Sequence, residues 1–304
     1  MARPYVSVLI PTYRPGPGIV RVLEKVAAQC VDVPFEVVIV DSSSSPDDVA
    51  RMRSYPVRFQ QIPSTEFGHG RTRNLLASLA IGDVLLFLSQ DAEPASENWM
   101  SALLEPLHDE RVAGTYARQI PRSNADPLMR FFLERTYGPQ PAWRRLSGST
   151  AVSIDDIFFS NVSSAIRRSV WQQHPFRDDI VMSEDQYWAY DVLTHGYDVV
   201  YVPDAQVYHS HNYTLPTLFN RNWQSGASLR GLIADSRSAI ARRGAGYVLD
   251  QARFLVRDGR MNWVPYMLVY EATKAAGFSL GMRYGKQQRP RAANTSVLIR
   301  DFAE

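Results

Sequence analysis

Cysteine is almost absent from this sequence: Cys30 is the single one among 304 residues. No intrachain disulfide can form, which excludes a disulfide-stapled fold and favours a reducing compartment. Long apolar runs are lacking as well, since the best candidate, residues 263–282, contains Glu271 and Lys274. The first residues do not have the basic start, apolar run and cleavage site of a signal peptide. We expect a cytoplasmic protein without a membrane-spanning helix.

A large excess of one charge is lacking too, because 33 Lys and Arg against 31 Asp and Glu give a net charge of +2. The two signs are nevertheless separated. Residues 1–211 hold 19 basic and 25 acidic residues (−6), whereas residues 212–304 hold 14 and 6 (+8). A basic tail favours an anionic partner such as the inner face of the cell membrane, and the alternative is a solvated, arginine-rich helical face. We expect no nucleic-acid partner.

What is present indicates a globular chain: 45% apolar and 21% charged residues exclude disordered and collagen-like proteins. Short apolar runs alternate with segments of helical periodicity in the first 90 residues. They predict strands at 6–10, 35–40 and 84–88, with 58–62 as an edge-like strand, and helices at 16–29 and 70–81, the second closed by Gly82. This order predicts an α/β fold with a doubly wound, mostly parallel sheet, whose ligands bind at the carboxyl ends of the strands.

The remainder has a mixed pattern. It predicts strands at 112–120, 158–166 and 199–202, a helix at 183–195, and helical structure from residue 215 onward. Residues 121–150 are rich in Pro, Gly and Ser, which favours a loop that acts as a mobile flap. We divide the chain into a body, residues 1–211, and a basic, mainly helical extension, residues 212–304.

Polar side chains follow the first two predicted strands. Pro11, Thr12 and Tyr13 end the first strand, and Asp41 with four serines ends the second. An aspartate there can accept hydrogen bonds from a nucleotide base or a ribose hydroxyl; the alternative for Asp41 is a turn or helix cap. No G-x-G-x-x-G follows the first strand, which disfavours a dinucleotide site.

Two later segments indicate an anion and a cation. F-G-H-G-R-T-R-N, ending at Asn74, opens a helix with arginines, which suits a diphosphate unless the arginines are solvated. Gln90 and Asp91 follow an apolar strand, where a carboxylate can hold Mg²⁺ or Mn²⁺ beside phosphates.

Acidic and imidazole groups come later. Ser183 and Gln186 have capping-box spacing, so the carboxylates between them lie in the first turn of a helix, whose dipole favours their ionised forms. That suits a general base; simple helix-end complementation is the alternative. His209 and His211 are two residues apart in a segment that we expect to be extended, so they should point to opposite sides, with one at most near a metal.

Taken in order, these segments resemble the inverting glycosyltransferases of family two, which share the GT-A fold. The motifs, within residues 5–226, are V-S-V-L-I-P-T-Y, V-V-I-V-D-S-S-S-S, G-R-T-R-N, S-Q-D-A, N-V-S-S-A-I-R-R-S-V-W, S-E-D-Q and Y-H-S-H. F-G-H-G-x-x-R-N and S-Q-D-A are similar to the versions in rhamnosyltransferases of bacterial surface polysaccharides. The resemblance implies single-displacement transfer of a sugar, with dTDP-L-rhamnose the favoured donor, to a hydroxyl of a glycan or lipid-linked glycan.

The resemblance also implies roles for individual residues. Asp185 matches the catalytic base. Asp91 matches the last Asp of the D-x-D motif and would hold Mg²⁺ or Mn²⁺ with His209 or, second, His211. Ser89 replaces the first Asp of that motif, which implies weaker metal binding. The donor would contact Pro11, Thr12, Tyr13, Asp41, Arg73, Gln90 and Asp91, and the acceptor side would hold Asn161, Ser163 and Glu184.

Two other functions fit parts of the pattern. A non-catalytic module that binds nucleotide sugars or polysaccharide would explain the missing first Asp of D-x-D. A nucleotidyltransferase would need a glycine-rich, basic loop after the first strand, but residues 11–18 contain Arg14 as their one basic residue.

Overall fold

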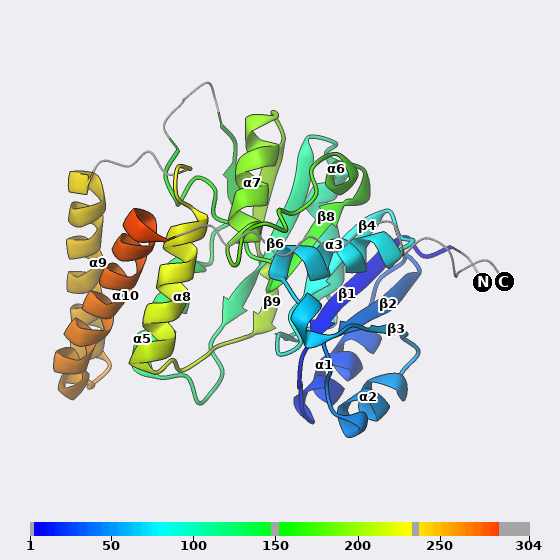
Figure 1. Ribbon diagram of the computed structural model, residues 1–304, viewed down its shortest axis with the longest axis horizontal. Coiled ribbons are helices and arrows are strands. Elements are labelled where there is room, and N and C mark those ends of the chain that lie inside the picture. Colours follow the sequence, from blue (N-terminus) through cyan, green and yellow to red (C-terminus); the bar gives the residue numbers. More distant parts are fainter. Residues whose placement is uncertain (1–2, 147–151, 233–236, 286–304) are drawn as a thin grey trace.

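The computed structural model describes residues 3–146, 152–232 and 237–285 (Figure 1). Within these residues the strands are β1 Val6–Thr12, β2 Phe35–Asp41, β3 Arg58–Gln61, β4 Val84–Leu88, β5 Glu93–Pro94, β6 Val112–Ile120, β7 Ala142–Arg144, β8 Ser163–Arg167 and β9 Asp198–Tyr208. The helices are α1 Gly18–Ala27, α2 Pro46–Arg53, α3 His69–Leu79, α4 Trp99–Leu104, α5 Pro127–Thr136, α6 Arg168–Gln173, α7 Glu184–Thr194, α8 Leu215–Ser228, α9 Arg237–Arg257 and α10 Val264–Tyr284.

The strands of the described residues form one sheet, in the order β3-β2-β1-β4-β8-β6-β9-β5, with β7 paired to β9 beside this path. β1, β2, β3 and β4 are joined by parallel pairs, and so are β6 and β9. β8 is antiparallel to both β4 and β6 and links the two parallel groups. This confirms the α/β fold with a mostly parallel sheet, and the carboxyl ends of β1, β2 and β4 lie side by side.

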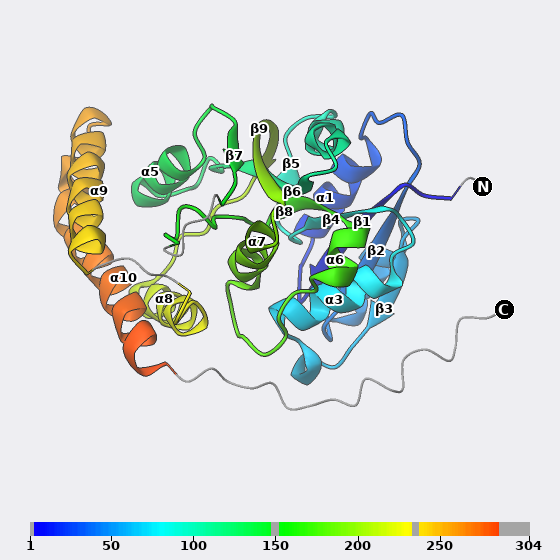
Figure 2. The ribbon, with the colours of Figure 1, turned by 90° about the horizontal axis from the view of Figure 1, so that it is seen from above.

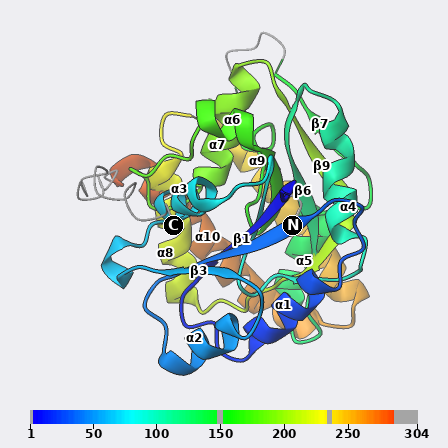
Figure 3. The same cartoon turned by 90° about the vertical axis from the view of Figure 1, so that its right-hand side faces the viewer.

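Helices cover both faces of the sheet, as Figures 2 and 3 show. On one face, α3, α6 and α7 enclose a core that includes Leu9, Phe87 and Trp188. On the other, α1, α2 and α4 enclose a core that includes Val8 and Leu86. Adjacent residues of one strand thus enter different cores, which is why β4 is apolar throughout and β1 is apolar except at Ser7 and Thr12.

The last three helices form a separate layer at one end of the molecule (Figure 1). α8 and α10 pack closely because glycines line their contact: a Cβ at Gly226 would lie 2.3 Å from the Phe278 carbonyl oxygen, and one at Gly281 2.2 Å from that of Trp223. A third apolar cluster joins this layer to α5 through Leu128. None of the helices in the described ranges is long and apolar enough to cross a membrane.

Several predicted boundaries were wrong. α3 ends at Leu79 and Gly82 does not cap it; Gly82 instead lies against β1, where a Cβ would be 2.8 Å from the Ser7 nitrogen. β8 begins only at Ser163, and β9 continues to Tyr208, six residues beyond the predicted end.

The predicted loop at 121–150 contains α5 and β7, and residues 147–150 lie outside the described ranges. α5 begins at Pro127. The N-cap residue of this helix, Asp126, accepts a hydrogen bond from Met129 N at 2.7 Å. Pro127 therefore marks a helix start, because a proline at the first helical position needs no amide partner. α2 and α4 were not predicted because both are short. α2 carries few apolar residues, and α4 follows directly on a turn.

Candidate active site

The ends of β1 and β2 are joined by Asp41. Its buried carboxylate accepts from Thr12 Oγ1 at 2.8 Å, from Ser44 N at 2.8 Å and from Gln61 Nε2 at 2.9 Å. These bonds order the serine turn, and Ser45 then caps α2. Asp41 therefore holds this edge of the sheet together, and its alternative role as a turn-organising residue is confirmed.

The ends of β1 and β4 are joined by Gln90. Its Oε1 accepts from Tyr13 N at 2.8 Å, and its Nε2 donates to Tyr13 O at 3.2 Å. The Tyr13 ring is 45% exposed, with the Arg14 guanidinium 5.1 Å from its centre. An exposed aromatic ring at the mouth of the sheet offers a flat surface on which a nucleotide base could stack.

Asp91, His209 and His211 form a cluster beside this edge. His211 Nε2 lies 3.1 Å from Asp91 Oδ2, His209 Nε2 lies 3.6 Å from Asp91 Oδ1, and the two Nε2 atoms are 3.0 Å apart. The expectation that the histidines point to opposite sides is wrong. β9 ends at Tyr208, so the alternation of a strand no longer applies to the segment that follows.

Gln119 of β6 orients His209. Its Oε1 lies 2.8 Å from His209 Nδ1, while its Nε2 donates to Ser160 Oγ at 3.0 Å and to the Tyr137 hydroxyl. Because Oε1 can only accept, we assign the imidazole proton to Nδ1, which leaves the lone pair of Nε2 facing Asp91. Gln119 was not predicted; a lone buried amide near the end of a predicted strand is the signal that could have indicated it.

The electrostatics keep His209 neutral and Asp91 ionised at pH 7. Burial lowers the pKa of His209 to about 4, against the opposing effect of Asp91. Burial alone would raise the pKa of Asp91, but the hydrogen bond with His211 and the charges of both imidazoles lower it to about 2. A neutral imidazole and an ionised carboxylate are the forms that bind metals.

The spacing of this cluster fits a divalent cation. Its donor atoms are 3.0–3.6 Å apart. Neighbouring ligands of an octahedral ion with bonds of about 2.1 Å lie about 3.0 Å apart. With donor atoms this close to that separation, Asp91, His209 and His211 could hold such an ion together.

Arg122 lies next to this cluster and was not predicted. Its Nη2 donates to the Asp91 carbonyl at 2.5 Å, and its Nη1 lies 3.7 Å from Glu93 Oε2. It is placed by β6 and the turn that follows, so its approach to Asp91, 31 positions earlier, has no signature in the sequence. A guanidinium there can bind phosphate oxygens.

A second carboxylate, Asp185, lies in the first turn of α7. It is partly buried and accepts from Asn161 N at 3.2 Å and from Gln186 N at 2.9 Å. Burial, with the neighbouring Glu184 carboxylate as the next cause, raises the pKa of Asp185 to about 7. The expectation that the helix dipole favours the ionised form of this carboxylate is therefore outweighed by burial and by Glu184. A carboxylate with this pKa can accept a proton near neutral pH.

The predicted capping box does not form. Ser183 has a φ of 63°, in the left-handed region, and makes no capping hydrogen bond. Its hydroxyl lies 3.3 Å from Ser225 Oγ of α8 instead. The start of α7 is thus tied to the C-terminal helices, which gives the extension direct contact with the segment that carries Asp185.

Glu184 and Arg73 form a buried ion pair beside Asp185. Arg73 Nη1 lies 2.8 Å from Glu184 Oε1, with 9% and 5% of the two side chains exposed. Two buried donors here, Arg73 Nε and Asn161 Nδ2, have no hydrogen-bond partner among the described residues. Ser163, by contrast, accepts from Trp99 Nε1 of α4 at 2.9 Å and faces the other core.

Relatives of known name support a family assignment. The sequence profile of Glycosyl transferase family 2 matches residues 7–173. The O-antigen chain rhamnosyltransferase WbaN of Salmonella anatum is 29% identical over 285 residues, which cover 92% of this chain and 90% of that protein. The O-antigen chain rhamnosyltransferase RfbN of Salmonella typhimurium is 28% identical over 284 residues, with the same coverage.

Solved structures support the fold. The mannosyltransferase PcManGT from Pyrobaculum calidifontis, in complex with GDP-Man and Mn²⁺, has a TM-score of 0.64 at 17% identity. The match covers 94% of this chain and 89% of that one, and it confirms the GT-A fold. Since the family profile spans more than half of the sequence, the chain belongs to glycosyltransferase family 2 and is a nucleotide-sugar-dependent glycosyltransferase.

Proposed function

We propose that this protein is an inverting rhamnosyltransferase of surface-polysaccharide synthesis. It moves rhamnose from dTDP-L-rhamnose to a hydroxyl of a glycan or lipid-linked glycan. The observation that carries the proposal is a chain of hydrogen bonds that connects a candidate cation cluster to a carboxylate: Gln119 holds His209 and Ser160, and Asn161, the next residue, donates to Asp185. The names of WbaN and RfbN support rhamnose as the sugar.

Asp185 is the general base of the proposed reaction. The acceptor oxygen forms a bond to the anomeric carbon while the bond from that carbon to the diphosphate oxygen breaks, and the hydroxyl proton passes to an Asp185 oxygen. The hydrogen bonds from Asn161 N and Gln186 N fix the carboxylate, since each uses one lone pair of a different oxygen. Inversion follows because attack and departure occur on opposite faces of the sugar.

The donor is held at the ends of β1, β2 and β4 in this proposal. Pro11, Thr12 and Tyr13 contact the nucleoside. Hydrogen bonds of Thr12 with Asp41 and of Tyr13 with Gln90 hold these residues in place. Arg122 and Arg73 supply positive charge near the diphosphate, although Arg73 also carries the Glu184 pair.

A divalent cation bound by Asp91, His209 and His211 would stabilise negative charge on the leaving diphosphate. Of Mg²⁺ and Mn²⁺ we favour Mn²⁺, because Mg²⁺ prefers oxygen ligands and this cluster offers two imidazole nitrogens. Ser89 stands where the D-x-D motif has its first Asp, and His211 would supply the metal ligand that this position lacks.

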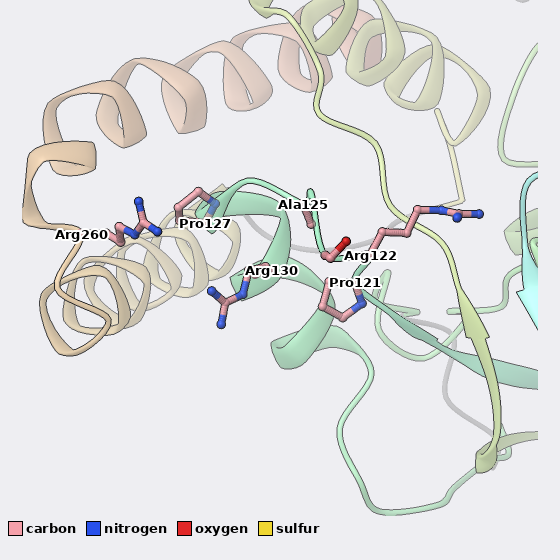
Figure 4. Close-up of a pocket in the computed structure, with 7 residues that line it drawn as sticks. Pro121, Arg122, Ala125, Pro127, Arg130 and Arg260 are labelled. Carbon is pink, nitrogen blue, oxygen red and sulfur yellow. The ribbon is translucent and has the colours of Figure 1, made fainter. Parts of the chain in front are cut away.

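The acceptor is proposed to carry a phosphate group at a membrane surface. A pocket of about 430 Å³ lies between α5 and the C-terminal layer, and three arginines, Arg122, Arg130 and Arg260, line it. In Figure 4, Arg130 and Arg260 come from facing segments, and Arg122 points away from them. Arg122 reaches the Asp91 carbonyl, so the pocket adjoins the metal end of the site.

The outer surface of the C-terminal layer fits a peripheral position on the cytoplasmic face of the membrane. Five apolar side chains there are more than half exposed: Leu249, Val256, Met261, Leu268 and Val269. Arginines of α9 and the turn after it lie among them in the sequence, and such a mixture suits an anionic lipid interface. We accordingly propose 1–211 as the catalytic domain and 212–304 as the membrane-facing extension.

A thermal-shift panel tests the donor, because a ligand that binds the native state raises its melting temperature. dTDP-L-rhamnose with Mn²⁺ should stabilise the protein more than UDP- or GDP-sugars do, and release of dTDP should follow. Selective stabilisation by UDP- or GDP-sugars would overturn the donor. Binding without hydrolysis or transfer would favour the non-catalytic module. Sedimentation with vesicles tests the membrane surface. If the amount of protein that sediments changes neither with the fraction of anionic lipid nor with salt, the proposed membrane position is overturned.

A further inference from the structure

A second group of metal-ligating side chains lies at the other end of α7 from Asp185. It comprises His174, which follows α6, Asp191 of α7, and His195, which follows α7. His174 Nδ1 lies 2.8 Å from Asp191 Oδ2, and His195 Nδ1 lies 3.4 Å from Asp191 Oδ1. The two imidazole rings are 4.5 Å apart, centre to centre, at an angle of 54°.

These separations match those around a small four-coordinate cation. Ligands of a tetrahedral zinc ion with bonds of about 2.0 Å lie about 3.3 Å apart. The observed 2.8 and 3.4 Å, which run to the two different oxygens of the Asp191 carboxylate, bracket that value. The ligand set of two imidazoles and one carboxylate leaves a fourth position for water.

The surroundings hold one ligand firmly and leave another accessible. The His174 side chain is 11% exposed, and its carbonyl accepts from Trp188 Nε1 at 3.0 Å, so its position is fixed by the core. The side chains of Asp191 and His195 are 38% and 57% exposed, which gives an ion a route of entry from solvent.

Hydrogen bonding alone accounts for only part of this arrangement. His195 Nδ1 lies 2.8 Å from the Asp191 carbonyl, and that contact would cap the end of α7 without any carboxylate nearby. The hydrogen bond from His174 to the Asp191 carboxylate would form equally well without His195. The side chains of both histidines nevertheless approach one carboxylate, His174 through Nδ1 at 2.8 Å and His195 through Nδ1 at 3.4 Å. An ion bound between them would replace the contact of His195 Nδ1 with the Asp191 carbonyl.

We propose that His174, Asp191 and His195 bind a borderline transition-metal cation of the Zn²⁺ class. Imidazole-rich ligand sets select such ions over Mg²⁺. The ion clamps the end of α6 to the end of α7, the helix whose first turn carries Asp185. This site is separate from Asp91, His209 and His211, and it takes no part in sugar transfer.

Cobalt substitution tests the proposal on the full chain. Tetrahedral Co²⁺ absorbs visible light much more strongly than octahedral Co²⁺, so the spectrum reports this site directly. We use Asp91→Asn as the background, which weakens the active-site cluster. Added Co²⁺ should give the tetrahedral spectrum with one equivalent bound, and an equivalent of Zn²⁺ should remove it.

Asp191→Asn or His195→Gln in that background should abolish the signal, and the same variants should lose the zinc-induced rise in melting temperature. His108→Gln, at a solvent-exposed histidine, is the matched control and should leave both signals intact. A spectrum unchanged in both site variants, or absent from the Asp91→Asn background altogether, would overturn the proposal. Circular dichroism identifies a variant that fails to fold, and the other substitution then decides.

Discussion

The two ends of the proposed active site, Asp91 with its histidines and Asp185 with Glu184, place the same residue type in opposite environments. Asp91 is partly exposed and faces two imidazoles, and its pKa is lowered to about 2. Asp185 is partly buried beside another carboxylate, and its pKa is raised to about 7. One aspartate is thus a permanent anion suited to a cation, and the other can exchange a proton near neutral pH.

The lowered pKa of Asp91 arises from neighbours that lie far away in the sequence, whereas that of Asp185 is raised by burial and then by the adjacent Glu184. His209 and His211 reach Asp91 from beyond the end of β9, 118 or more positions later. Glu184 adjoins Asp185 in the chain, but its own partner, Arg73, is 111 positions away. Carboxylate chemistry in this protein is therefore set by tertiary contacts more than by the local helix or strand end.

The largest expected effect comes from the base end. Asp185→Asn keeps the shape of the side chain but removes its capacity to accept a proton. Transfer should fall by about 10²–10⁴-fold, while the melting-temperature shift with dTDP-L-rhamnose stays close to that of the unmodified protein. Initial rates of dTDP release at saturating donor measure the loss.

Asp32→Asn, at an exposed aspartate in the loop before β2, controls for the loss of one charge and should leave the rate unchanged. Turnover of Asp185→Asn near that of this control would remove Asp185 as the base. The comparison between the two ends would then have to be explained without general-base catalysis.

The sequence predicts the first half of the fold well because its signals are local. Three apolar runs become β1, β2 and β4, the edge-like run becomes β3, and Asp41 and Asp91 lie at or just after strand ends as expected. Short elements escape this reasoning: α2 and α4 have eight and six residues, too few for a clear periodicity. Pro127, the first residue of α5, is typical of a loop as well, and only the hydrogen bond of its neighbour Asp126 identifies a helix start.

Much of the candidate site could not be predicted, because it depends on contacts between residues that are distant in the sequence. The capping-box spacing of Ser183 and Gln186 is a local signal, yet Ser183 adopts a left-handed conformation and contacts Ser225 of α8 instead. Gln119 and Arg122 act on His209 and Asp91 through β6, whose neighbours are β8 and β9. Which strands pair is decided by the whole sheet, so these contacts have no signature in the sequence.

The next largest effect should come from the buried ion pair that supports the base end. Arg73→Met leaves Glu184 buried without its partner, and it should lower the free energy of unfolding by about 3–5 kcal/mol. Urea denaturation followed by circular dichroism measures it. The double variant Arg73→Met with Glu184→Leu removes both charges and should recover most of that loss. No recovery would mean that Arg73 acts mainly through other contacts, such as the His69 carbonyl at 3.3 Å.

A smaller effect is expected at the metal end. Gln119→Leu removes the acceptor that fixes the proton on His209 Nδ1, so Nε2 would no longer be held toward Asp91. Mn²⁺ affinity should fall about 10–100-fold, as measured by calorimetry in the absence of donor. Gln60→Leu, at a partly buried glutamine of β3, is the matched control. Equal affinity in the two variants would remove Gln119 from the support of the cluster.

The smallest effect is a shift in the pH dependence of the rate, caused by a variant that brings the pKa of Asp185 closer to that of Asp91. The rate should rise with pH as Asp185 loses its proton, with the midpoint near its pKa of about 7. Glu184→Gln removes the like charge beside it and leaves Arg73 unpaired, and both changes lower the pKa of Asp185. The rising limb of kcat/KM should therefore move to lower pH, while Mn²⁺ affinity at fixed pH stays the same. A limb that stays in place, or moves upward, would mean that a group other than Asp185 controls the profile.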